Sequence, residues 1–73
     1  MFKKSTVISI STDYITLGQF LKLADIIETG GEAKMFLASN KVIIDGVEDN
    51  RRGRKLRGGE KLEINGESFE IKK

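Results

Sequence analysis

The side chains best suited to bind a ligand are five basic residues within seven consecutive positions. They are Arg51, Arg52, Arg54, Lys55 and Arg57. The chain has 13 Lys and Arg against 11 Asp and Glu, so without these five it would have 8 against 11 and a net charge of −3. The basicity is therefore local, and a local basic patch can neutralise phosphates. The planar guanidinium of Arg also suits bidentate phosphate contacts better than the ammonium of Lys. The composition predicts a polyanion as the partner.

The alternative for this basic cluster is an ordinary solvated loop. Runs of charge are usually solvated faces, and Glu48, Asp49 and Glu60 are close enough in the chain to pair with the basic side chains. Against this, four of the five residues are Arg, and Gly53 would let the backbone approach a ligand closely. The residues by themselves leave both interpretations open.

Residues for acid-base, nucleophilic or metal chemistry are scarce. The chain has no His and no Cys, so it lacks the usual zinc ligands, a disulfide framework and the commonest catalytic bases. Its Asp and Glu residues are scattered, and the sequence contains no glycine-rich phosphate-binding motif. We therefore expect no enzyme activity, no metal, no cofactor and no small-molecule substrate.

Capping signals and apolar spacing predict two helices. Thr16 and Gln19 have the spacing of a capping box, so a helix should begin at residue 17 and continue to about residue 28. A second box, Thr29 with Glu32, predicts a second helix after a tight corner. That helix should end near Asn40, a residue that tolerates the left-handed conformation. The residues expected to face the core are Leu17, Phe20, Leu21, Ala24 and Ile27 in the first helix and Ala33, Phe36 and Leu37 in the second.

The remaining segments predict β-structure. The expected strands are residues 6–11, 42–44, a return strand from residue 47, 61–64 and 67–71. Asp45-Gly46 and Asn65-Gly66 are strong signals for two-residue hairpin turns. The basic cluster then forms the loop between two hairpins, and Leu56, its one apolar residue, should anchor it to the body of the protein.

The order of strand, helix, tight corner, helix, hairpin, basic loop and hairpin resembles the S4-type RNA-binding domain, also called the αL motif. The resemblance covers residues 16–64 and depends on the leucine-containing first helix, on Ala33-Lys34 at the start of the second, and on the hairpin at residues 42–46. The fuller runs at residues 14–22, 31–34 and 50–57 are similar to the stand-alone bacterial YaaA-like subgroup.

Two positions depart from the wider family. The Ser-Arg pair found at the corner in many members is Thr29-Gly30 here, so a frequent basic RNA contact is missing. The usual Pro-Gly-Asp before the last strand is replaced at residues 58–60 by Gly-Gly-Glu, which keeps the turn. The resemblance implies an α+β fold with two short helices packed on a small antiparallel sheet of hairpins, and binding of structured, ribosomal RNA in assembly of the large ribosomal subunit.

Two lysines outside the loop are further RNA-binding candidates. Lys34 should point outward next to the buried Ala33, and the resemblance places that helix face beside the RNA. Lys41 follows the second helix, although exposed lysines in such places are usually only solvating. Phe20 and Phe36 stand at core positions while Tyr14 is undecided, so we expect few exposed aromatic residues. This favours structured RNA, recognised by backbone and shape, over a single strand that stacks its bases.

We expect a single domain over residues 1–73, in a monomeric protein of the bacterial cytoplasm. No apolar run approaches the length of a membrane span. The alternative function is a protein-interaction adaptor or DNA-binding module that uses the same basic loop.

Overall fold

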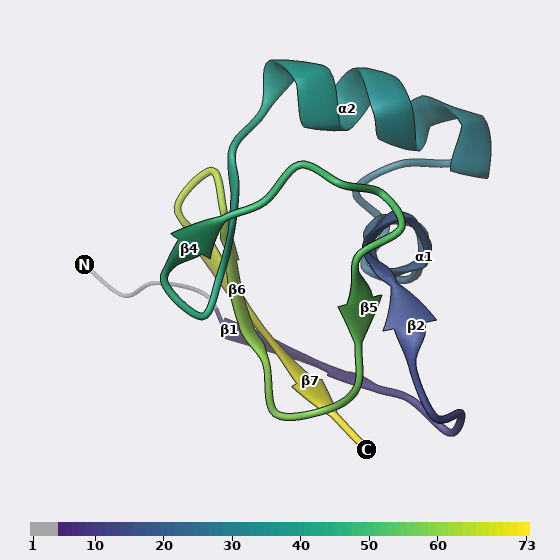
Figure 1. Cartoon of the computed structure of the whole chain (residues 1–73), viewed down its shortest axis with the longest axis vertical. Helices are drawn as coiled ribbons and strands as arrows, with labels where there is room; N and C mark the ends of the chain where they lie inside the picture. The colour runs from purple at the N-terminus through teal and green to yellow at the C-terminus, as the bar shows by residue number, and fades with distance from the viewer. Residues whose placement is uncertain (1–4) are drawn as a thin grey trace.

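A computed structural model describes residues 5–73 and shows two sheets and two short helices (Figure 1). The first four residues of the predicted domain lie outside this range. In chain order the elements are β1 (Ser5–Ser9), β2 (Ile15–Thr16), α1 (Leu17–Leu23), the 3-10 turn η1 (Gly30–Glu32), α2 (Ala33–Ser39), β3 (Val42–Ile44), β4 (Val47–Glu48), β5 (Lys55–Leu56), β6 (Lys61–Ile64) and β7 (Glu67–Lys72). The predicted α+β class is confirmed.

The larger sheet has the strand order β1-β7-β6-β3-β4, and the smaller sheet pairs β2 with β5. Both predicted hairpins are present, β3 with β4 and β6 with β7. Their turns use positive φ angles, 51° at Asp45 and 84° at Gly46, and 51° at Asn65 and 85° at Gly66. Asp, Asn and Gly are the residues that adopt this conformation at least cost, which is why these pairs predict the turns correctly.

The sheet is mixed, whereas the sequence predicted only antiparallel hairpins. The first strand, expected at residues 6–11 and found at Ser5–Ser9, lies parallel to β7, with Thr6 opposite Phe69 and Ile8 opposite Ile71. A period-two pattern of apolar residues is the same in parallel and antiparallel strands, so it does not reveal the direction of pairing.

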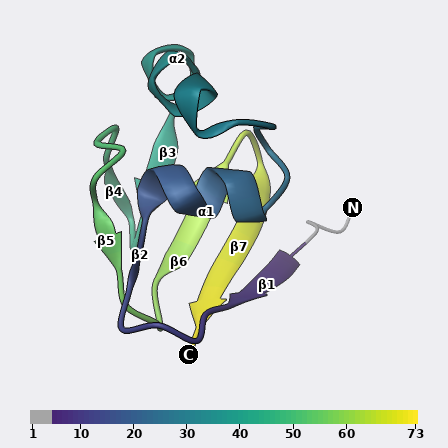
Figure 2. The ribbon, with the colours of Figure 1, turned by 90° about the vertical axis from the view of Figure 1, so that its right-hand side faces the viewer.

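The hydrophobic core lies between the helices and one face of the larger sheet. Figure 2 shows α1 crossing in front of β6 and β7, with α2 at one end of the sheet. Phe20 of α1 is fully buried and meets Phe69 of β7 edge to face, with ring centroids 5.3 Å apart. Such aromatic pairs contribute about 0.5–1.5 kcal/mol beyond the area that they bury.

The first helix is shorter than predicted. It ends at Leu23, and Asp25 has a φ of 63°, a left-handed conformation that breaks the helix. Ile26 and Ile27 donate their backbone N–H groups to the carbonyl of Leu21, at 2.9 and 3.3 Å, so the chain turns back at once. Ile27 is therefore buried by a turn, although its position fits the helical spacing.

The second helix ends at Ser39, next to Asn40 as predicted, but Asn40 is not left-handed and the helix is preceded by a 3-10 turn. The corner is a 3-10 turn, in which the Glu32 carboxylate accepts hydrogen bonds from the backbone N–H and the hydroxyl of Thr29, each at 3.2 Å. Asn40 ends α2 in an extended conformation, with φ −132°, and its backbone and side-chain nitrogens both donate to the carbonyl of Phe36. Ala33 and Leu37 are buried as predicted, whereas Phe36 is only half-buried.

Within the described range, no helix has the length and apolar character needed to cross a membrane.

Candidate nucleic-acid interface

The backbone of the basic loop is fixed on the beginning of α1. Leu17 and Gly18 donate their N–H groups to the carbonyls of Arg54 and Arg52, at 2.8 and 2.9 Å. The first amides of a helix have no partner within it, so these bonds satisfy groups that otherwise need a cap or water. The pairing of β2 with β5 and the fully buried Leu56 hold the other end of the loop, as the sequence predicted for Leu56.

The predicted capping box of α1 completes this arrangement. The Gln19 N–H donates to the Thr16 hydroxyl at 3.2 Å, and the Gln19 side-chain oxygen accepts from the Thr16 N–H at 2.9 Å. Gly18 then lies where the loop and both helices meet. A Cβ atom there would be 3.4 Å from the carbonyl oxygen of Arg52 and 3.6 Å from the Cβ of Ala33. These are ordinary van der Waals distances, so the loop packs directly against the first turn of α1 and a methyl group at residue 18 would still fit.

Asp49 neutralises part of the basic cluster. Its carboxylate accepts hydrogen bonds from Arg51 Nε and Nη2, at 3.0 and 2.8 Å, and lies 3.4 Å from Arg54 Nε. Arg54 also donates from Nη1 to the carbonyl of Lys55 at 2.8 Å. Two of the five basic side chains are therefore engaged within the loop, as the solvated-loop interpretation expected for Asp49.

Glu60 does not neutralise the cluster in the same way. Its two carboxylate oxygens accept the backbone N–H groups of Arg57 and Gly58, each at 2.7 Å, so this carboxylate fixes the turn after β5. Among residues 5–73, the side chains of Arg52, Lys55 and Arg57 form no ion pair. These three carry the available positive charge of the loop.

Arg52 stands between two shallow hollows. One, of about 420 Å³, lies between the first turn of α1 and the corner before α2 and is bordered by Gly18 and Gly30. The other, of about 300 Å³, is bordered by Lys34 and Leu37 of α2. The structure thus brings Arg52 and Lys34, predicted from separate segments, to the same surface.

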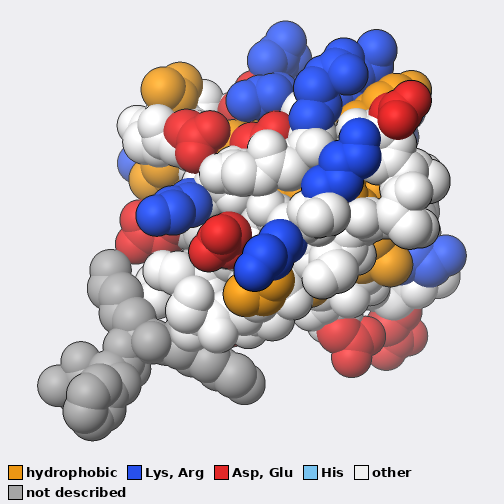
Figure 3. Space-filling model, turned by 90° about the horizontal axis from the view of Figure 1, so that it is seen from below, with side chains coloured by type: hydrophobic (Ala, Val, Ile, Leu, Met, Phe, Trp, Pro, Cys, Tyr) orange, Lys and Arg blue, Asp and Glu red, His pale blue; other side chains and the backbone are white. Residues whose placement is uncertain are grey.

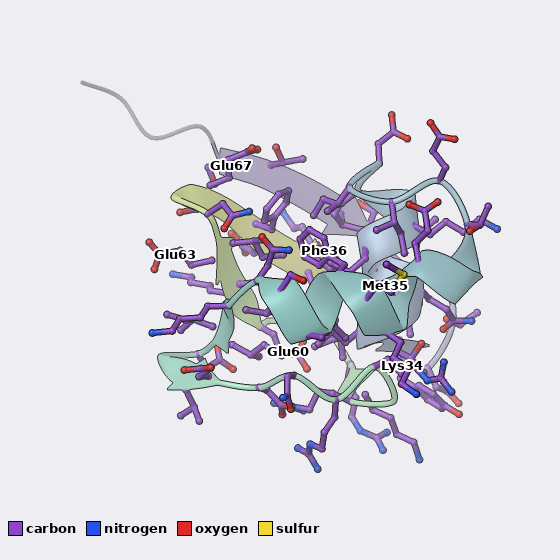
Figure 4. All side chains as sticks on the ribbon, turned by 90° about the horizontal axis from the view of Figure 1, so that it is seen from above. Lys34, Met35, Phe36, Glu60, Glu63 and Glu67 are labelled. Atoms are coloured by element: carbon purple, nitrogen blue, oxygen red, sulfur yellow. The ribbon has the colours of Figure 1, made fainter. Side chains whose placement is uncertain are left out.

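Several basic side chains lie close together on one part of the surface, with acidic side chains among them and elsewhere (Figure 3). In Figure 3, Lys and Arg side chains gather along one edge of the visible face. In Figure 4, Lys34 extends from α2 on the side of the basic loop, Phe36 points to the opposite side of that helix, and Glu63 and Glu67 lie at the far end of the sheet. A hollow on the outer face of the sheet has Glu63 and Glu70 in its lining, so it is poorly suited to phosphates.

Comparisons with known proteins identify the family of this chain. A family model described as the S4 domain matches residues 8–72. The chain belongs to the S4 domain family. A probable ribosome maturation protein of Bacillus subtilis (strain 168), RlbA, is 57% identical over 65 residues, which cover 88% of this chain and 92% of that protein. The resemblance to the S4-type domain and to a stand-alone member is confirmed.

Three predicted RNA-binding residues of this S4 domain are separate from the surface at Arg52. Lys41 is exposed between α2 and β3 and borders neither of the two hollows. Lys55 and Arg57 point to the outer face of the β2–β5 ribbon, where their charged groups lie 4.9 and 5.6 Å from the centroid of the Tyr14 ring. Tyr14, undecided from the sequence, is 40% exposed.

Sequence reasoning missed the contact of Gly18 with the basic loop, whereas it named Asp49 as a possible partner of the basic side chains. The contact of Gly18 with Arg52 joins segments more than thirty residues apart, so no local signal reveals it. Asp49 did have a local signal, since it stands two residues before Arg51 and its Oδ1 accepts the Arg51 backbone N–H at 2.9 Å. Asp commonly makes this bond to the backbone two residues on.

The ion pair in the loop predicts a pH-dependent stability. The hydrogen bonds from the Arg51 guanidinium lower the pKa of Asp49 from 3.8 to about 2. Because the carboxylate is harder to protonate in the folded chain, its stabilisation is complete above about pH 5 and is lost as the pH falls to about 2. The Arg51 side chain is 73% exposed, so solvent screening should reduce the effect to about 1 kcal/mol or less.

Urea unfolding of the wild type and of Asp49→Asn at a series of pH values measures this contribution. The wild type should be more stable near neutral pH, and the difference should shrink towards zero in acid. A difference that is constant with pH would show that the Asp49 carboxylate gains nothing from its arginine partners.

Proposed function

We propose that this S4 domain binds structured ribosomal RNA, without chemistry of its own, as a monomer that acts on ribosomal particles in the cytoplasm during maturation of the large subunit. The observation that carries the proposal is the single surface on which Arg52 of the basic loop and Lys34 of α2 flank the same hollow. The name of the relative, a probable ribosome maturation protein, supports a role on the ribosome.

The geometry favours recognition of a folded RNA backbone. Arg52 and Lys34 form no ion pair with any residue in the described part of the chain, so neither has to leave a protein partner to reach a phosphate. Two hydrogen bonds from α1 already hold the loop backbone, so the main chain should lose little conformational entropy when RNA binds. A preorganised surface keeps more of the interaction energy as affinity.

The same geometry ranks the arginines. Arg52 should contribute most to the affinity. Its guanidinium forms no ion pair within the described residues, so its full positive charge can act on a phosphate. Arg51 and Arg54 share the Asp49 carboxylate, so a phosphate that approaches them also meets a negative charge at 2.8 and 3.4 Å from their nitrogens. We place them as secondary contacts, with Lys41 as a peripheral one.

Alanine variants test this ranking. Arg52→Ala should weaken binding to every structured RNA tested by a similar factor, and should reduce the magnitude of the slope of log affinity against log salt by about one unit or less. Arg54→Ala should have a smaller effect on both. Lys61 is an exposed lysine of β6 that borders neither hollow at Arg52, so Lys61→Ala is the matched control and should change neither.

Two results would contradict the proposal. If Arg52→Ala abolished binding to one RNA and spared another, the surface would be reading bases instead of backbone and shape. If the wild type bound no structured RNA, and instead bound an acidic protein or duplex DNA through the same loop, the adaptor or DNA-binding alternative would replace it.

A further inference from the structure

The outer face of the β2–β5 ribbon carries a cluster that the surface at Arg52 does not use. Ile15 pairs with Leu56 across the ribbon and both are buried. Side chains alternate between the two faces of a strand, so the neighbouring Tyr14, Lys55 and Arg57 are directed outward. Lys55 Nζ and Arg57 Cζ lie 4.9 and 5.6 Å from the centroid of the Tyr14 ring.

We propose that Tyr14, Lys55 and Arg57 form a site for one unpaired nucleotide of the RNA, with the base stacked on the Tyr14 ring and the cations on its flanking phosphates. This inference rests on the proposed function, because it adds a second contact to the same RNA. It differs from that function in what is recognised, since a stacked base has to be unpaired and turned out of the helix.

The energies favour an exchange of partners at the ring. A cation over an exposed aromatic ring gains about 0.5–1 kcal/mol, whereas stacking of a base on an aromatic side chain is worth about 1–3 kcal/mol. A base can therefore displace a cation from Tyr14. The displaced Lys55 or Arg57 then lies beside the phosphate that the nucleotide brings with it, where a charge-assisted hydrogen bond replaces the contact with the ring.

The surroundings of the ring leave room for this ligand. A hollow of about 490 Å³ lies beside Tyr14 and is bordered by Thr12, Thr16 and Gln19, a size within the range of small-molecule sites. Asp13 also borders this hollow, with its carboxylate 3.6 Å from Lys73 Nζ, and the Glu60 carboxylate accepts the backbone amides of Arg57 and Gly58. Gln19 accepts from Thr16 N–H through its oxygen, which leaves its amide nitrogen as a donor.

The chain offers its own reporter for the test. Tyr14 is the single Tyr and there is no Trp, so tyrosine emission comes from this site alone. Two RNA hairpins of the same stem sequence, one fully paired and one with a single bulged nucleotide, are titrated into the wild type, Tyr14→Phe and Tyr14→Leu. Thermal melting of each variant confirms the fold, which should be unaffected because Tyr14 is 40% exposed.

The bulged hairpin should bind the wild type roughly five- to a hundred-fold more tightly than the paired one, and should alone quench the Tyr14 emission. Tyr14→Phe keeps the ring and should keep this preference. Tyr14→Leu should lose the preference while its affinity for the paired hairpin stays the same. Equal binding of both hairpins to the wild type, or an equal loss on both in Tyr14→Leu, would overturn this inference alone. Binding of neither hairpin would overturn the proposed function as well.

Discussion

Phe20→Ala is expected to leave little folded protein at physiological temperature. Phe20 of α1 is fully buried, and its ring packs edge to face on that of Phe69 in β7, with ring centroids 5.3 Å apart. Truncation of a buried Phe to Ala costs about 3–5 kcal/mol, because the transfer energy is lost and a cavity remains. A single core in a domain of this size supplies no more than about 3–5 kcal/mol of net stability. Thermal melting followed by circular dichroism measures the loss.

Phe36→Ala is the matched control for this prediction. The sequence placed Phe36 in the buried stripe of the second helix, yet it is only half-buried and packs at the edge of the core. Its truncation should therefore cost clearly less than that of Phe20, since part of the ring already contacts water. Equal losses in the two variants would mean that the α2 side of the core is as tightly packed as the α1 side.

Reversal of the three available loop charges should abolish association with ribosomal particles. Arg52, Lys55 and Arg57 are changed to Glu, which takes the formal net charge of the chain from +2 to −4, because each change removes two positive units. Arg51 and Arg54 are kept, because they hold Asp49 and their reversal would place like charges together inside the loop. The variant should stay folded, with its backbone bonds to α1 intact.

Sedimentation of ribosomal particles from a cell lysate gives the measurement. The wild type should co-sediment at low salt and be released as salt rises, since exposed phosphate contacts are screened over about 10 Å at about 0.1 M ionic strength. RNase should release it too. The reversed variant should remain in the supernatant. If it still co-sedimented, or if RNase left the wild-type complex intact, binding would depend on a protein surface and not on RNA phosphates.

The sequence alone determined the features that depend on neighbours in the chain. Asp45-Gly46 and Asn65-Gly66 specify their hairpins because few residues adopt positive φ angles at low cost. Thr16 and Gln19 specify the start of α1 because a capping box is closed within four residues. The basic composition of residues 51–57 predicted a polyanion partner, and the membership of the S4 domain family agrees with it.

The tertiary structure decided how these parts meet. The parallel pairing of β1 with β7 joins the first and last strands, and the burial of Ile27 is achieved by a turn, although helical spacing describes its position equally well. The same structure divides one run of basic residues into three groups. Arg51 and Arg54 bind Asp49. Arg52 lies beside α2, and Lys55 and Arg57 lie at the Tyr14 ring. A linear sequence gives the number of charges, but the direction in which each side chain points and the partner that it finds depend on strand alternation and on contacts between distant segments.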